Sequence, residues 1–156
     1  MSSTVCVEGE SSNSNSKCFN ILYFNARSIL PKLDELKVLA EDNNPDVICI
    51  AESWLCQEIS NVEVSIPGYL LYRHDRDRHG GGVLMYVKEY IQVRVLPPCP
   101  DLEVLALSLY SGSNRVCLTV FDRPPSSSVE IFSQVSTYFD SLCITQFSNF
   151  VFFRRF

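Results

Sequence analysis

The sequence predicts a mixed α/β fold, in which one parallel β-α-β unit is followed by antiparallel hairpins. Apolar runs at 19–24 and 46–51 are typical of short buried strands, and a segment with helical periodicity separates them. Beyond residue 69, short β-rich runs alternate with Gly, Pro, Asp and Ser/Asn turns. The 156 residues, 46% of them hydrophobic, are enough to bury the core of one domain.

A helix is expected between the first two strands. Ser28 can cap it, Pro31 suits its first turn, and leucines recur at helical spacing through residue 41. The segment Asn-Asn-Pro at 43–45 ends the helix. A strand-helix-strand unit of this length is a right-handed crossover, so its two strands are expected to be parallel.

The later strands are expected to pair as antiparallel hairpins, because only short turns separate them. The clearest turn is Ser-Gly-Ser-Asn at 111–114. The expected strands are 70–72, 83–87, 91–96, 102–110 and 115–121.

A second helix is expected over 128–142, with Ser128 as its cap and Glu130 in its first turn. One apolar stripe of this helix should pack against the core. The stripe consists of Val129, Phe132, Val135, Phe139 and Leu142. A last strand is expected at 150–153.

Composition sets the domain organisation and the compartment. Residues 1–17 are rich in Ser and Asn, which predicts a disordered tail before a single domain at 18–156. The net charge of −5 argues against a broad basic nucleic-acid surface without excluding a local one. Seven cysteines lie scattered with no CxxC pair, which argues against a disulfide scaffold. With no leader and no apolar run of membrane length, a nuclear or cytoplasmic protein is expected, neither secreted nor transmembrane.

Two polar residues, Asn25 and Glu52, follow the two strands of the β-α-β unit. Ligands bind beyond the carboxyl ends of such strands, so both side chains should face one shared site. A carboxylate among apolar neighbours needs a cation, a proton or a hydrogen-bond partner, and Mg²⁺ prefers oxygen ligands. The alternatives are a capping or salt-bridged Glu52 and an Asx-type cap at Asn25. Arg27 could contact a phosphate in fork geometry.

Five segments follow one another in a recognisable order: 25–28 (Asn-Ala-Arg-Ser), 45–55 (through Ala-Glu-Ser-Trp-Leu), 66–69 (Ile-Pro-Gly-Tyr), 73–76 (Arg-His-Asp-Arg) and 80–83 (Gly-Gly-Gly-Val). The series resembles the endonuclease/exonuclease/phosphatase superfamily. More narrowly, it is similar to the apurinic-type endonuclease domain of non-LTR retrotransposons of the LINE type. An ordered match from about residue 19 to residue 153 is more specific than any single motif.

The resemblance implies a four-layered α/β sandwich and metal-dependent cleavage of phosphodiester bonds in DNA. It implies that Glu52 holds Mg²⁺ or Mn²⁺ and that Asn25 lies in the same phosphate and metal pocket. It also implies DNA phosphate contacts for Arg27, Arg73, Arg76 and Arg123. In the parent elements this domain nicks target DNA for a reverse transcriptase, which is absent from this sequence.

The sequence departs from the family pattern in its second half. Asp122 stands in the place of the family's tyrosine, and an aspartate cannot donate as a phenol does at neutral pH. The strand at 150–153 leads in the family into Gly-Asp-Phe-Asn, whereas Arg-Arg-Phe follows here. The family's late Asp-His pair has no counterpart. The sequence thus predicts a C-terminally truncated copy that is inactive as an endonuclease.

Other interpretations stay open. The protein could be a non-catalytic fragment that binds DNA or a protein partner, or a related metal-dependent phosphatase acting on a phosphoinositide or nucleotide. His74 and His79 lie in a charged loop and are expected on a solvated face. The three glycines at 80–82 are expected to form a tight turn, because no Lys-Ser/Thr or helix follows them as in a phosphate-binding loop.

Overall fold

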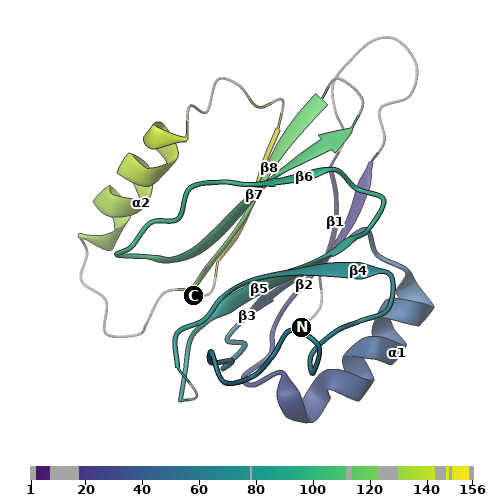
Figure 1. Ribbon diagram of the computed structural model, residues 1–156. Coiled ribbons are helices and arrows are strands. Elements are labelled where there is room, and N and C mark those ends of the chain that lie inside the picture. Colours follow the sequence, from purple (N-terminus) through teal and green to yellow (C-terminus); the bar gives the residue numbers. More distant parts are fainter. Residues whose placement is uncertain are drawn as a thin grey trace.

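The structure is a computed structural model, and it describes residues 3–7, 18–77, 79–111, 114–122, 130–142, 147 and 149–154. Two β-sheets lie face to face, and each is covered on its outer face by one helix (Figure 1). The order of layers is helix, sheet, sheet, helix. The four-layered α/β sandwich predicted from the sequence is therefore confirmed.

The first sheet has five strands in the order β1-β2-β3-β5-β4. Strands β2 and β3 are parallel, and β5 runs antiparallel to both β3 and β4. This arrangement confirms the predicted β-α-β unit and the hairpin that follows it. The bounds are β1 (Ser3–Val7), β2 (Phe19–Asn25), β3 (Val47–Ala51), β4 (Tyr69–His74) and β5 (Val83–Lys88).

The crossover between β2 and β3 contains a short 3-10 helix, η1 (Leu30–Lys32), and then α1 (Leu33–Asn43). The predicted cap at Ser28 is wrong, because neither helix has a side-chain cap and Lys32 is the N-cap of α1. Ser28 instead has a left-handed φ of 77° and donates its N–H to the Glu52 carbonyl. The predicted end is confirmed: Asn44 closes α1 in the left-handed conformation that asparagine tolerates.

The second sheet has four strands in the order β6-β7-β8-β9. Strands β7 and β8 form the predicted antiparallel hairpin, with Ser111 paired to Asn114 across the turn. Strand β9 is parallel to β8, so a second β-α-β unit is built here. The bounds are β6 (Val93–Val95), β7 (Glu103–Ser111), β8 (Asn114–Asp122) and β9 (Asn149–Arg154).

Helix α2 (Ile131–Ser141) forms the crossover between β8 and β9. It packs on the second sheet through a face that includes Ile131, Tyr138 and Leu142. The predicted stripe is wrong at Phe132, whose exposed fraction is 44%, because the packed face is turned by about one residue. Ser128 and Val129, the predicted cap and the first stripe residue, lie outside the described residues.

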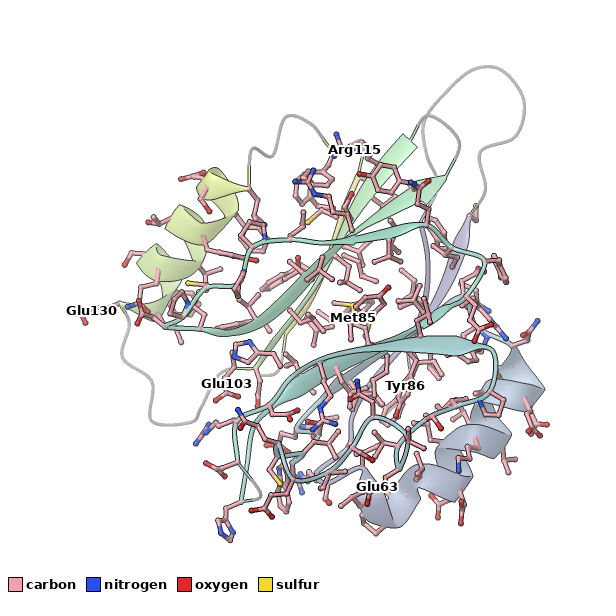
Figure 2. The ribbon with its side chains drawn as sticks, in the orientation of Figure 1. Glu63, Met85, Tyr86, Glu103, Arg115 and Glu130 are labelled. Atoms are coloured by element: carbon pink, nitrogen blue, oxygen red, sulfur yellow. The ribbon has the colours of Figure 1, made fainter. Side chains whose placement is uncertain are left out.

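The main core lies between the two sheets. Successive side chains of a strand point alternately into this core and toward the helix on the outer face of the sheet. Met85 points into the space between the sheets, whereas the next residue, Tyr86, points toward the α1 layer (Figure 2). The Tyr23 and Phe153 rings stack across the two sheets with centroids 4.8 Å apart. Since Tyr23 and Phe153 lie near the ends of β2 and β9, the carboxyl ends of both parallel pairs meet at one edge of the sandwich.

Strand β1 lies within the segment 1–17 that the sequence predicts as a disordered tail. Residues Ser3–Val7 instead pair antiparallel with β2, from Ser3 opposite Tyr23 to Val7 opposite Phe19. The β-branched residues of Ser-Thr-Val-Cys-Val favour a strand, although a Ser/Asn-rich run follows them. The domain boundary at residue 18 stays a prediction.

Two further findings concern the cysteines and the helices. The cysteines described with side chains, Cys18, Cys49, Cys56, Cys99 and Cys117, are free thiols. Of the helices that the structure describes, none is long and apolar enough to cross a membrane.

Candidate functional site

Asn25 and Glu52 meet at the carboxyl edge of the β2-β3 pair. Asn25 is the last residue of β2 and lies opposite Ala51, the last residue of β3, so Glu52 follows directly. The two chains stay together beyond the strands, because the Ala26 N–H donates to the Ala51 carbonyl at 2.9 Å. The structure thus brings together the two residues that the sequence singles out.

Glu52 is a buried carboxylate on an unusual backbone. The residue is only 6% exposed, and its φ of 54° lies in the left-handed region that side chains rarely adopt. The Nε of Arg27 lies 3.9 Å from Glu52 Oε2, while the Arg27 side chain itself is 78% exposed. Arg27 therefore stands at the solvent side of this carboxylate, where its other donors can reach an anion.

Asn25 is exposed at the same edge, and its Oδ1 accepts the Arg27 N–H at 3.1 Å. This is an Asx turn, but it is not the helix cap that the sequence left open as an alternative, because η1 begins only at Leu30. The turn fixes the direction of the Asn25 carboxamide. A contact between this carboxamide and a ligand stays a prediction.

A glycine segment from the β4–β5 connection holds the turn after Glu52. The N–H groups of Ser53 and Trp54 donate to the carbonyls of Gly82 and Gly81, at 3.0 and 3.1 Å. Gly81 and Gly82 have φ of 71° and 79°, and a Cβ on Gly82 would lie 2.6 Å from Ser53 Oγ. The bridge between Asp77 and Gly80 closes a turn just before Gly81 and Gly82, so the tight turn expected at 80–82 lies slightly earlier in the chain. The close approach of Gly82 to Ser53 requires glycine at residue 82.

The second sheet contributes an acidic pair to the same edge. Glu103, the first residue of β7, lies directly opposite Asp122, the last residue of β8. The Arg76 Nη1 donates to Glu103 Oε1 at 2.8 Å. The hydrogen bond and charge of Glu103, together with the charges of Asp77 and Asp122, raise the pKa of Arg76. Arg76 thus offsets the repulsion between two carboxylates brought together by the hairpin register.

Asp122, which the sequence resemblance places at the family's tyrosine, is 1% exposed. Its neighbours at alternate positions in β8, Val120 and Leu118, belong to the core between the sheets, so Asp122 faces the same interior. A buried negative charge at this edge opposes the approach of a phosphate unless a cation intervenes. An aspartate at this position therefore affects the electrostatics of the site as well as its hydrogen bonding.

Arg73 is oriented into the protein. Its Nη1 donates to the Ile59 carbonyl at 2.9 Å, its Nη2 to the Cys56 carbonyl at 2.8 Å, and its Nε to Asp75 Oδ1 at 2.9 Å. Only 12% of the side chain is exposed. These contacts indicate that Arg73 holds the loop at 56–61. They argue against the DNA contact that the resemblance implies for this residue.

The remaining sequence candidates lie in different surroundings. His79 is exposed, as expected. His74 is half-buried on β4, and its Nδ1 lies 3.0 Å from the Val104 carbonyl of the facing sheet, so the expected solvated face is wrong for this residue. His74 is two residues after Tyr72 on β4, so it shares the face of the strand that packs against the core between the sheets. Arg123 lies outside the described residues.

Sequence reasoning missed Glu103. Its Oε2 accepts the Gly82 N–H at 3.0 Å while its Oε1 binds Arg76, so one carboxylate joins the two sheets at the candidate site. Figure 2 shows Glu103 at this end of the sandwich, with Arg115 at the opposite end of the second sheet. The available signal was a charged residue that opens a long apolar strand, Val-Leu-Ala-Leu-Ser-Leu.

The donors at this edge fit a hard divalent cation only in part. Glu52 and Asn25 supply a carboxylate and a carboxamide oxygen, the ligand types that Mg²⁺ and Mn²⁺ prefer. Within the described part of the chain, no group of three His, Cys, Asp or Glu side chains could hold a metal ion. Such a site suits Mg²⁺ binding in which waters and a substrate phosphate complete the coordination.

Comparison with known proteins gives a consistent fold. No family model matches the sequence, and no curated protein matches it. The structure is similar to the endonuclease domain of TRAS1, a telomere-specific non-LTR retrotransposon, with a TM-score of 0.61 and 14% identity over 85% of this chain. It is also similar to a humanized D. rerio TDP2 (TM-score 0.61, 15% identity, 85% of this chain). A third is the 3′-5′ exonuclease NExo from Neisseria meningitidis (TM-score 0.60, 20% identity, 87% of this chain).

These likenesses establish the fold: the chain has the architecture of the endonuclease/exonuclease/phosphatase superfamily. The structures that share this architecture with the chain include the endonuclease domain of a retrotransposon. The chain spans 56% of the TRAS1 domain structure, 63% of the TDP2 structure and 57% of the NExo structure.

Proposed function

We propose that the edge carrying Asn25 and Glu52 binds DNA phosphate together with Mg²⁺ or Mn²⁺, in a domain related to the endonucleases of non-LTR retrotransposons. The observation that carries the proposal is the placement of these two residues at the carboxyl ends of adjacent parallel strands. The shared fold with the TRAS1 endonuclease domain and with NExo supports DNA as the ligand.

Each residue of the edge has a distinct part in this proposal. The buried Glu52 carboxylate would hold the cation. A carboxylate with little access to water is stabilised strongly by a positive charge bound to it. The Asn25 carboxamide, fixed by its turn, would orient a phosphate oxygen. Arg27, largely exposed beside Glu52, would bind the phosphate from the solvent side. The bound cation would supply positive charge against the charge that develops on a phosphate during hydrolysis.

We further propose that these 156 residues bind DNA without cutting it. The support is Asp122: a buried aspartate lies opposite Glu103 where the resemblance places a tyrosine, so the phenol hydroxyl is missing there. Two neighbouring carboxyl groups at this edge also oppose the approach of a phosphate. A binding role is therefore the better supported function for this chain. Hydrolysis would need a proton donor such as a phenol hydroxyl, which residue 122 does not provide.

A comparison of wild type with Glu52→Gln tests the proposal. Wild type should bind a duplex oligonucleotide more tightly with Mn²⁺ than with EDTA, with affinity falling steeply as salt rises. Glu52→Gln should lose the Mn²⁺ dependence and keep the salt dependence. Supercoiled plasmid should stay intact with either protein. Equal Mn²⁺ dependence in both proteins would contradict the cation role of Glu52.

The same samples separate the other functions. Nicking of the plasmid by wild type, abolished in Glu52→Gln, would show an active endonuclease. Release of inorganic phosphate from small phosphoesters would favour a phosphatase instead.

A further inference from the structure

The backbone at the candidate site requires support from outside its own strand. Glu52 and Trp54 both have φ of 54°, a left-handed conformation that residues with side chains rarely adopt. Such a conformation persists only where surrounding contacts determine it. The position of the Glu52 carboxylate therefore depends on what holds this turn.

Hydrogen bonds hold the turn from two sides. On one side, the N–H groups of Ser28 and Ile29 donate to the carbonyls of Glu52 and Ser53, each at 3.0 Å. On the other side, the N–H of Ser53 donates to the Gly82 carbonyl at 3.0 Å. The first contact comes from the segment that follows β2 in the same unit. The second depends on where the glycine segment lies.

Glu103 of the opposite sheet fixes the glycine segment. Its Oε2 accepts the Gly82 N–H at 3.0 Å, and its Oε1 accepts from Arg76 at 2.8 Å. A Cβ on Gly81 would collide with this carboxylate and lie 2.7 Å from the Arg76 Cδ, so the segment is closely seated on the pair. The Glu103 side chain is 15% exposed.

We propose that Glu103 is a positioning residue for Glu52. The link runs from the Glu103 carboxylate to the Gly82 N–H, and from the Gly82 carbonyl to the Ser53 N–H, one peptide after Glu52. Both oxygens of Glu103 accept hydrogen bonds from within the protein, which assigns this carboxylate a role in holding the glycine segment. The inference rests on the proposed function only in taking a divalent cation as what Glu52 holds.

Two conservative variants separate position from charge. Glu103→Asp keeps the charge but shortens the side chain by one methylene, which withdraws the carboxylate from Gly82. Glu103→Gln removes the charge but keeps an acceptor oxygen at the same reach. The exposed Glu130, at the N-terminal end of α2 and far from Glu103, provides the matched control Glu130→Gln (Figure 2).

Amide hydrogen exchange measures the link without any metal. In Glu103→Asp the amides of Ser53 and Trp54 should exchange at least about tenfold faster than in wild type, while the amides of β3 keep their rates. In Glu103→Gln and Glu130→Gln both sets should remain within about twofold of wild type. Unchanged exchange at Ser53 and Trp54 in Glu103→Asp would overturn the proposal.

Mn²⁺ affinity, measured by electron paramagnetic resonance, gives the consequence for the site. Glu103→Asp should weaken binding by about tenfold, as outer partners of metal ligands do, and Glu103→Gln should bind as wild type does. The reverse order, with weak binding in Glu103→Gln and normal binding in Glu103→Asp, would show a charge effect and overturn the positioning role. If wild type binds no Mn²⁺, the proposed function fails, and the exchange rates alone still decide the positioning claim.

Discussion

Ser53 and Gly82 lie so close that no side chain fits between them: a Cβ on Gly82 would stand 2.6 Å from Ser53 Oγ. The contact joins the turn after β3 to the start of β5. It comes directly after Glu52, and the Gly82 carbonyl also accepts the Ser53 N–H at 3.0 Å. The candidate site is thus built on backbone geometry as much as on its polar side chains.

Replacement of this glycine should therefore destabilise the protein. Gly82→Ala combines a φ of 79° with the collision against Ser53, and we expect a loss of about 1–3 kcal/mol in the free energy of unfolding. Gly80→Ala is the matched control, because nothing lies within 4 Å of a Cβ at residue 80. Urea denaturation of both variants measures the difference. Equal stability of the two would contradict the tight approach.

Arg73 should respond as a structural residue. Arg73→Lys keeps the charge but cannot reach the Ile59 and Cys56 carbonyls and Asp75 together, because lysine lacks the planar fork. We expect a loss of about 2–4 kcal/mol in the free energy of unfolding. Arg94→Lys, at an exposed residue of β6, should cost far less.

Urea denaturation again provides the measurement for Arg73, and DNA affinity at fixed salt provides the second one. If Arg73→Lys left stability unchanged and weakened DNA binding, the phosphate contact implied by the family resemblance would be correct and the structural role would be wrong.

Stability should fall at high pH because buried tyrosines must stay protonated. Burial raises the pKa of Tyr86 from 10.0 to about 12, an effect that the charge of Arg73 partly opposes. Between pH 10 and about 12 the folded state therefore binds more protons than the unfolded state. The contribution of Tyr86 to the free energy of unfolding is complete below pH 10 and is lost as the pH rises toward about 12.

Tyr86→Phe isolates that contribution. The variant should be less stable than wild type near pH 8, since the Tyr86 hydroxyl donates to the Val64 carbonyl at 2.7 Å. Its free energy of unfolding should then fall less steeply than that of wild type above pH 10. Identical slopes in urea denaturation between pH 10 and 12 would argue against the raised pKa.

The sequence was most informative where local pattern and tertiary structure agree. The strand before Asn25, the helix with its leucines and the strand before Glu52 are clear in the sequence. Strands joined by such a helix are parallel, so their carboxyl ends, and both residues, lie at one edge of the sheet. The hairpin β7–β8 could be predicted for the same reason, from two apolar runs and a short turn.

Other features depend on contacts between distant segments and could not be predicted. Ser28 has the residue type of a helix cap, but its N–H is used by the Glu52 carbonyl, which places Ser28 outside the helix. Phe132 fits a helical stripe, yet the packed face of α2 is set by the sheet beneath it. Glu103 contacts Gly82 from 21 residues away, and only the packing of the two sheets reveals that contact.

The most direct measurement of the central claim is Mn²⁺ binding to wild type and Glu52→Gln, followed by electron paramagnetic resonance of free Mn²⁺. Wild type should bind one Mn²⁺, and Glu52→Gln should bind it at least about tenfold more weakly, because a carboxamide is a poor substitute for a carboxylate ligand. Both proteins should show the same melting temperature within the error of the measurement. Equal Mn²⁺ affinity in the two proteins would contradict the account.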